Sequence, residues 1–517
     1  MHSVLLIDEI LRAVFAQLRE GGNPNSEFAR LATICQAWKE PVLDYLWETL
    51  PSTEPLLALL PTLKRENGAY VLSADPSPEA LANLSAYASR VRSVQHHGRT
   101  ATKLPSAILE LLASSSGLFL PSLSTVALNL SDPTKRTLAP QLYLSTQLRS
   151  VTIDVGFARR AAAGTNAHPG ESVCAYVDAI SQSVPRLESL NLRGRVGERI
   201  LDSVAEMQNL RTLSLCVGTD LSPRIIAAIG LFPHLHDLRV QLDGMDEEAL
   251  RDALTEAGPC FAALKTLNIR AVPEVMAAFF GSFPKTARLS SARLESDLKP
   301  RAADSWIPAL EHLATKASFT LEELSIQSLT SFCEVLDPTV PPRLHFTIAT
   351  LAPLERATCL RRFFLDASVP ADMNDADFGA LARWWPCIEH LGLWTKPVDA
   401  FDYPTYFTMQ PRATPASLRA FSEVCGRLRS LSVPMDISAV PSPAQPSTPA
   451  AEGNQRVLES IIIGCAKKGP DVDADELAAC LYNAFPRVKR IEFDCGEETA
   501  WPDVADAYAR LQAAAVL

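Results

Sequence analysis

The stretch LESLNL, residues 187–192, has leucine at its first, fourth and sixth positions. The same spacing of apolar residues returns in the segments that begin at Leu210, Leu235 and Leu264. In each segment the last two apolar residues alternate with polar ones, which is the pattern of a short strand with one buried face. One such unit cannot bury its own apolar face, whereas stacked neighbours can. The spacing therefore predicts a stack of similar strand-containing units.

Further copies of the pattern lie on both sides of this region. The clear copies are Leu123/Val126/Leu128, Leu148/Val151/Ile153, Leu321/Leu324/Ile326, Leu360/Phe363/Leu365, Ile388/Leu391/Leu393, Leu428/Leu431/Val433 and Val488/Ile491/Phe493. Weaker copies are Val91/Val94/His96 and Thr286/Leu289/Ser291. Successive starts at residues 187, 210, 235 and 264 are separated by 23, 25 and 29 residues, which is typical of leucine-rich repeats of about 20–29 residues. An ordinary α/β domain with scattered leucine-rich strands is the alternative, and it does not explain so many copies in one frame.

We therefore expect an α/β fold in which residues 91–517 form a leucine-rich-repeat solenoid, a horseshoe with one strand and one helix per repeat. Linking helices are predicted at 223–231, 246–257, 273–280, 375–384, 415–425 and 474–484. An alanine-rich helix at 502–516 is suited to cap the last repeat. The step from Leu428 to Val488 is much longer than the others and contains the segment PSPAQPSTPAAEG. Its composition predicts a disordered loop at 433–455.

The composition limits the classes of function. The chain has 517 residues, of which 47% are hydrophobic, and a net charge of −11, which argues against a general binder of nucleic acid or of anionic membranes. Its 11 cysteines form no C-x-x-C pair, so we expect free thiols in a reducing intracellular compartment, either the cytoplasm or the nucleus. The N-terminal segment carries Asp8 and Glu9 within its apolar run and is not expected to be a signal peptide. No apolar run is long enough to predict a membrane span.

No sequence motif for catalysis or cofactor binding is present. The patterns G-x-G-x-x-G, G-x-x-x-x-G-K-[ST], G-x-S-x-G and H-E-x-x-H do not occur. The nine histidines are scattered, without cysteine or acidic residues at the spacing of metal ligands. We therefore expect no enzyme, no cofactor and no metal site.

The N-terminal residues predict three short helices. Residues 4–19 have apolar side chains at positions 6, 7, 10, 14 and 18, widened by Leu11 and Phe15, which indicates an amphipathic helix. Ser26 is a candidate N-cap for a second helix, and Pro41 fits the first turn of a third. A cluster this small cannot bury all of its apolar surface. We expect the excess to pack on the repeats or on another protein.

Three of these segments carry a resemblance to a known family. LIDEIL at 6–11, LATICQAW at 31–38 and PVLDYLW at 41–47 resemble an F-box, and the arrangement that follows is similar to that of the F-box/leucine-rich-repeat proteins of the fungal F-box family. The usual Leu-Pro at the start of the motif is Leu-Ile here. The resemblance implies an F-box-like domain at 1–50 and a helical connector at 51–90.

The same resemblance implies a function. Such proteins are substrate-recognition subunits of SCF-type cullin–RING ubiquitin ligases, in which the F-box binds a Skp-family adaptor. The residues that would contact the adaptor or hold the three helices together are Leu6, Ile10, Leu31, Ile34, Trp38, Leu46 and Trp47. The alternative is a non-catalytic leucine-rich-repeat scaffold whose N-terminal helices only cap the solenoid. The two hypotheses differ in whether the tryptophans and the face of the first helix are exposed.

A target protein is expected on the concave face of the repeats, to which strand residues between the buried ones point. Arginine and aromatic residues dominate the energetics of protein interfaces. The candidates for partner binding on this face are Arg193, Arg239, Arg270, Phe364, His390 and Trp394. We expect the three arginines to share one register and to form a basic strip. The alternative is a solvated face on which the long loops cover the two aromatic residues.

Overall fold

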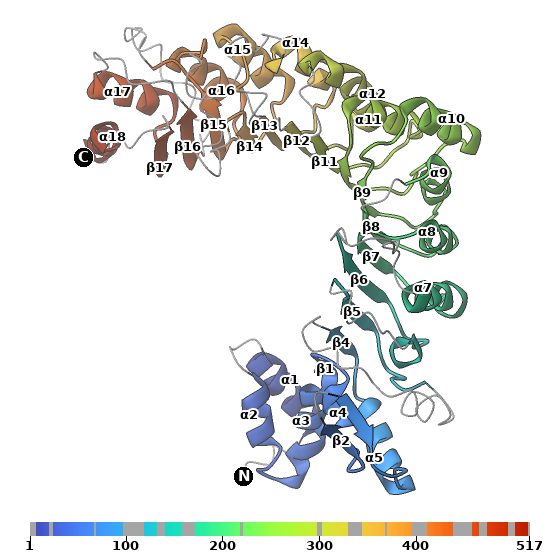
Figure 1. Ribbon diagram of the computed structural model, residues 1–517. Coiled ribbons are helices and arrows are strands. Elements are labelled where there is room, and N and C mark those ends of the chain that lie inside the picture. Colours follow the sequence, from blue (N-terminus) through green and yellow to red (C-terminus); the bar gives the residue numbers. More distant parts are fainter. Residues whose placement is uncertain are drawn as a thin grey trace. The chain divides into compact units, whose positions relative to one another are not determined.

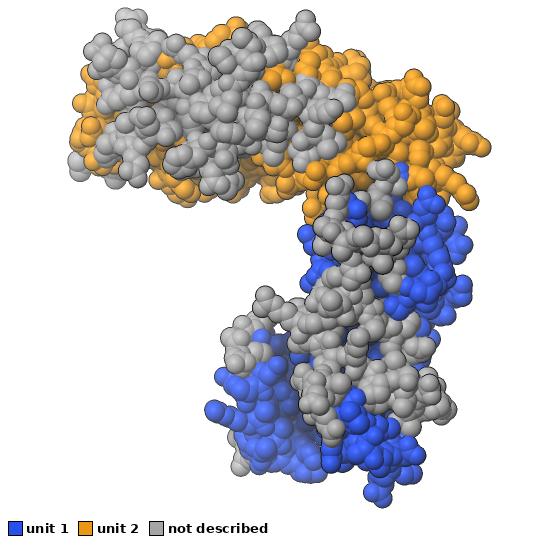
Figure 2. Space-filling model, in the orientation of Figure 1, with its two compact units in different colours: residues 1–221 blue, residues 222–517 orange. Residues whose placement is uncertain are grey.

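The computed structural model forms two compact units, residues 1–221 and 222–517 (Figure 2). It describes the residues 7–19, 24–66, 69–96, 118–131, 140–157, 171–217, 221–296, 302–328, 344–367, 370–394, 411–437, 458–464, 473–494 and 502–514. Each unit is built of parallel strands alternating with helices (Figure 1). This arrangement is the α/β architecture of a leucine-rich-repeat solenoid, as the leucine spacing predicts.

The first unit opens with three helices, α1 (Asp8–Arg19), α2 (Pro24–Leu31) and α3 (Gln36–Glu48). Helix α2 begins before Ser26, so Ser26 is not its N-cap. Helix α3 begins at Gln36, and Pro41 therefore lies inside the helix and not in its first turn. The ring of Trp38 packs on Phe15 of α1 at 6.0 Å. This contact stabilises the turn before Pro41 in a helical form that the proline alone disfavours.

We expected a helical connector at 51–90, but the segment is only partly helical. Between α4 (Glu54–Leu57) and α5 (Pro78–Ala88) the chain forms a hairpin of β2 (Leu63–Glu66) and antiparallel β3 (Ala69–Leu72). The sequence AYVL of β3 contains tyrosine and valine, which favour strands. The hairpin is too short to give a clear alternation in the sequence.

In the described part of the first unit, six strands pair in parallel, with β1 at the edge. In spatial order they are β1 (Thr49–Leu50), β4 (Ser93–His96), β5 (Thr125–Asn129), β6 (Ser150–Gly156), β7 (Ser189–Gly194) and β8 (Thr212–Val217). Leu190 of β7 is in register with Val151 on one side and Leu213 on the other. All three are buried, as are the residues two positions later. The repeated apolar positions therefore form continuous buried rows. The helical segments of this part are η3 (Pro140–Tyr143), α7 (Glu171–Ser183) and α8 (Glu198–Ala205).

The second unit continues the same plan. Its strands, in spatial order, are β9 (Asp237–Gln241), β10 (Thr266–Arg270), β11 (Ser291–Ser296), β12 (Glu323–Ser328), β13 (Arg362–Ala367), β14 (His390–Gly392), β15 (Ser430–Pro434), β16 (Ser460–Gly464) and β17 (Arg490–Asp494). Its helical segments are α9 (Pro223–Gly230), α10 (Glu247–Ala257), α11 (Pro273–Gly281), η4 (Ala303–Trp306), α12 (Ile307–Ala317), α14 (Ile348–Leu351), η6 (Ala352–Arg356), α15 (Asp375–Trp384), η8 (Pro415–Ser417), α16 (Leu418–Val424), α17 (Ala474–Ala484) and α18 (Pro502–Ala514).

Two repeats differ from the sequence-based assignment. The frame Thr286/Leu289/Ser291 is wrong by three residues, because the buried positions are Leu289, Ala292 and Leu294. An alanine in place of the usual leucine concealed the correct frame. A further repeat was missed at Leu458/Ile461/Ile463, where β16 pairs with both β15 and β17. The long step from Leu428 to Val488 therefore contains a complete strand.

The predicted disordered loop at 433–455 is partly wrong. Val433 and Pro434 belong to strand β15, and residues through 437 are ordered parts of the repeat. The remainder of that prediction, residues 438–455, lies outside the described residues. Within the part of the chain that the structure describes, no helix is long and apolar enough to cross a membrane, and no three histidine, cysteine or acidic side chains group as they would around a metal ion.

Trp394 lies across the strand surface of the second unit. It is 3% exposed, and its indole Nε1 donates to Oδ2 of Asp494 at 3.1 Å. A Cβ atom at Gly464 would lie 1.9 Å from the indole ring. The ring therefore packs on the backbone of β16, and glycine is the residue that leaves room for it.

We predict that Gly464→Ala lowers the free energy of unfolding by about 1–3 kcal/mol, because the added methyl group must displace the Trp394 ring. The measurement is the urea midpoint followed by circular dichroism. The control is Gly379→Ala in α15, where a Cβ would meet its nearest neighbour, an atom of Arg383, at 3.5 Å. This control should raise stability by about 0.5–1 kcal/mol, since alanine favours helices. Equal midpoints for Gly464→Ala and the parent would contradict the packing.

Candidate partner-binding surfaces

The three N-terminal helices share an aromatic core. The Phe15 ring meets Phe28, Trp38 and Tyr45 edge to face, with centroids 6.1, 6.0 and 6.1 Å away. The rings of Phe28 and Tyr45 stack at 5.7 Å. Phe15 and Phe28 are almost completely buried. These ring contacts, drawn from all three helices, give the cluster a core of its own.

Three of the predicted adaptor-binding residues contribute to this core. Leu31, Trp38 and Leu46 are partly buried against it. Trp47 faces elsewhere, and its ring packs on Tyr87 of α5 at a centroid distance of 4.8 Å. These four side chains therefore hold the N-terminal part of the unit together. A partner would meet them only at their exposed edges.

The other predicted adaptor-binding residues have different environments. Ile34, in the turn between α2 and α3, is 53% exposed. Ile10 is partly buried, and Leu6 lies outside the described residues. The two hypotheses differ in whether the tryptophans and the first helix are exposed. Both tryptophan rings pack on other side chains of this chain.

One edge of the apolar stripe of α1, in contrast, is exposed. Ile7 at its start, Val14 and Leu18 are 45%, 43% and 36% exposed. Residues seven and four apart lie on the same side of a helix. Leu11 and Phe15 of the same helix point into the core. The apolar stripe is thus wider than the core contact requires. This width was the sequence feature that indicated an exposed apolar surface on α1.

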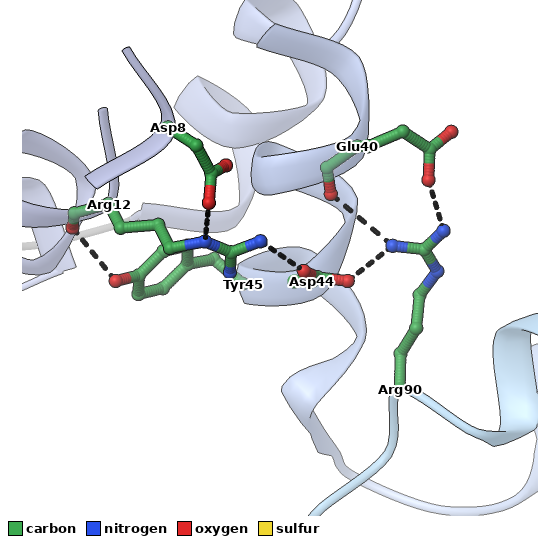
Figure 3. A network of polar contacts seen from close by, with 6 residues as sticks. All are labelled: Asp8, Arg12, Glu40, Asp44, Tyr45 and Arg90. Carbon is green, nitrogen blue, oxygen red and sulfur yellow. Dashed lines mark hydrogen bonds and ion pairs between the residues drawn. The ribbon is translucent and has the colours of Figure 1, made fainter. Parts of the chain in front are cut away.

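Ion pairs connect this helical cluster to the start of the repeats (Figure 3). The Arg12 guanidinium donates to Asp8 at 2.7 Å and to Asp44 at 2.9 Å. Arg90, which precedes β4, pairs with both Asp44 and Glu40. Hydrogen bonds to Asp8 and Asp44 raise the pKa of Arg12. Asp44 of α3 therefore joins α1 to the segment that leads into the sheet.

Backbone pairing makes the same connection. Strand β1 follows α3 directly and pairs with β4, with Thr49 opposite Ser93. The amide of Arg92 donates to the carbonyl of Glu48 at 2.9 Å. The helical cluster is therefore joined to the edge of the sheet through β1.

On the strand surface of the first unit, Arg193 is neutralised. Its guanidinium donates to Oδ2 of Asp154 on β6 at 2.7 Å. The same group lies over the exposed ring of Phe157, 5.2 Å from its centroid. Phe157, which the sequence reasoning missed, therefore joins Arg193 as a candidate contact residue.

The predicted basic strip is wrong. Arg239 of β9 is opposite Asn268, whereas Arg270 of β10 is opposite Gln241. The two arginines are therefore in different rows, because Arg239 lies four residues after the first leucine of its repeat and Arg270 six. Arg270 is also paired with Asp243 at 3.3 Å. Arg193 and Arg270 are each neutralised by a nearby carboxylate. The three arginines therefore do not form the predicted basic strip.

The other candidates on the second unit differ in exposure. Phe364 is 40% exposed, and its ring lies over Gly392, where a Cβ would be 2.7 Å from it. His390 is partly buried, and burial lowers its pKa, as does the nearby Arg362. Trp394 was expected to be available to a partner, but it is buried against Gly464. Phe364 therefore remains the candidate aromatic contact.

The fold and these surfaces define a class of protein, a repeat protein of parallel strands and helices that begins with a cluster of three helices. No protein-family model matches the chain, and no curated protein matches it in sequence. Among solved structures it is similar to a chain in the crystal structure of the Rad7 and Elc1 complex in yeast, with a TM-score of 0.34 and 13% sequence identity over 90% of this chain and 92% of that chain. At this level the likeness says nothing of partners.

We predict that Phe15→Ala opens the N-terminal helices, because removing a fully buried ring costs about 3–5 kcal/mol. Hydrogen exchange of the full chain should show faster exchange throughout α1–α3 and unchanged exchange in β7–β8. Val14→Ala, on the exposed side of the same helix, should change stability by less than about 0.5 kcal/mol and leave exchange unaltered. Equal protection in the two variants would contradict the division of the apolar stripe of α1 into a buried and an exposed part.

Proposed function

We propose that this chain is a substrate-recognition subunit of an SCF-type cullin–RING ubiquitin ligase. In this proposal α1–α3 bind a Skp-family adaptor, and the strand surface of the repeats binds the target protein. The chain itself forms and breaks no bonds. Holding a target lysine near the ubiquitin-loaded enzyme raises its effective concentration, which is how a tethering subunit accelerates transfer.

The observation that carries the proposal is the exposed apolar face of α1. Single exposed apolar side chains are common on folded proteins. Here Ile7, Val14 and Leu18 share one side of a short helix, and Ile34 is exposed in the same cluster. The aromatic core beneath is already filled by Phe15 and its neighbours, so these side chains have no role in it. The grouping of these exposed apolar side chains is typical of a surface that binds a partner.

A leucine-rich-repeat scaffold remains the second candidate function, and it also rests on an observation. The pairing of β1 with β4 and the ion pairs of Arg90 fasten the helices onto the first repeats. A helical cap needs these contacts and no adaptor. It does not need an exposed apolar face on α1, and this difference separates the two functions.

We predict that the full chain co-purifies with a recombinant Skp-family adaptor and that Val14→Asp with Ile34→Asp weakens binding at least about tenfold. Both side chains are exposed, so the double variant should keep the circular dichroism and melting temperature of the parent. Trp38→Ala is less suitable, because that ring belongs to the core.

The matched control is Leu231→Asp, an exposed leucine in the second unit, which should bind the adaptor as the parent does. A parent chain that is folded and does not bind the adaptor would overturn the ligase proposal and leave the scaffold. Equal binding by the parent and the double variant would overturn the assignment of the α1 face.

A further inference from the structure

A groove lies on the helical side of the second unit. Helix α11 packs between α10 and α12 (Figure 1), and together the three helices line a cavity of about 730 Å³. The groove involves neither the strand surface nor the N-terminal helices. All three helices link successive parallel strands, so they run in the same direction.

The groove exists because the outward side of α11 carries small residues. Ala277, Ala278 and Gly281 line its floor, and a Cβ at Gly281 would meet no atom within 4 Å. On the inward side, Phe279 and Phe283 are buried with ring centroids 5.6 Å apart. The aromatic packing fixes α11 from below, so the groove is formed before any ligand arrives.

The two ends of the groove carry opposite charges. Glu274 lies in the first turn of α11 at one end. Glu247, in the first turn of α10, lies at the same end, where it is paired with Arg251, another residue that lines the groove. At the other end, Lys316 lies in the last turn of α12 and donates to the carbonyl of Phe283 at 2.6 Å. Lys285, just after α11, is exposed. The groove is thus acidic where its helices begin and basic where they end.

We propose that this groove binds an amphipathic helix of a partner protein, antiparallel to α11. Helices favour acidic residues in the first turn and basic residues in the last. A helix in the antiparallel direction places its acidic turn beside Lys285 and Lys316, and its basic turn beside Glu247 and Glu274. Its apolar side then lies over the alanines, which is the helix-in-groove mode of recognition.

The dimensions of the groove define the partner segment. Helix α11 has nine residues, which at 1.5 Å per residue is about 14 Å. About two and a half turns of a partner helix therefore lie within the groove. Small floor residues let two helix axes approach closely, so the contact side of the partner accommodates leucine or alanine.

The test uses two fluorescent, side-chain-stapled helical peptides of about 14 residues, since unstapled peptides of this length are marginally helical. The forward peptide has an acidic first turn, a leucine–alanine face and a basic last turn, and the neutral peptide has the same face with glutamine at every charged position. Fluorescence anisotropy with the full chain at low salt should show the forward peptide binding about tenfold more tightly. Comparable binding of both peptides, or no binding of either, would overturn the proposal.

Two variants test the site itself. Lys285→Glu with His312→Glu, two exposed residues that line the groove, should remove the preference for the forward peptide, because the basic end of the groove is lost. The matched control is Lys265→Glu with His234→Glu, the same change on exposed residues outside the groove, which should leave the preference unaltered. Ala278→Trp should fill the groove and abolish binding of the forward peptide. Unchanged binding by both groove variants, with circular dichroism as in the parent, would contradict the assigned site.

Discussion

The structure depends on the burial of two alternate apolar side chains in each strand against their equivalents in the strands beside it. Leu190 and Leu192 of β7 lie between Val151 and Ile153 on one side and Leu213 and Leu215 on the other. A slip of one residue would turn both side chains to the solvent face, so the spacing fixes the register. The helices, the polar strand rows and the groove over α11 occupy positions that this register determines.

The sequence was most informative where propensity and packing agree. Helices α15 and α17 occupy the ranges predicted from their apolar spacing. Prediction failed where another residue occupies the position of the usual leucine, as at Ala292. It also failed where a strand follows a low-complexity segment, as at Leu458. The interior position of Pro41 depends on contacts with another helix, and nothing within the local sequence reports them.

The candidate site was harder to predict than the fold, because a motif gives residue types and not their directions. Trp38 and Trp47 resemble contact residues in the sequence, yet their rings pack on Phe15 and Tyr87. The exposed face of α1 follows from the excess width of its apolar stripe. Trp394 is buried because its ring packs over Gly464, two strands away. This tertiary contact could not be predicted from the local sequence.

Helices α1–α3 are joined to the first repeats and also expose apolar side chains along one edge of α1, which we propose bind an adaptor. Hydroxyl-radical footprinting of the full chain with and without a Skp-family adaptor tests this most directly. We predict that Val14, Leu18 and Ile34 lose reactivity when the adaptor is added, while Phe364 keeps its reactivity. Unchanged labelling of the α1 face, or protection confined to the repeats, would contradict it.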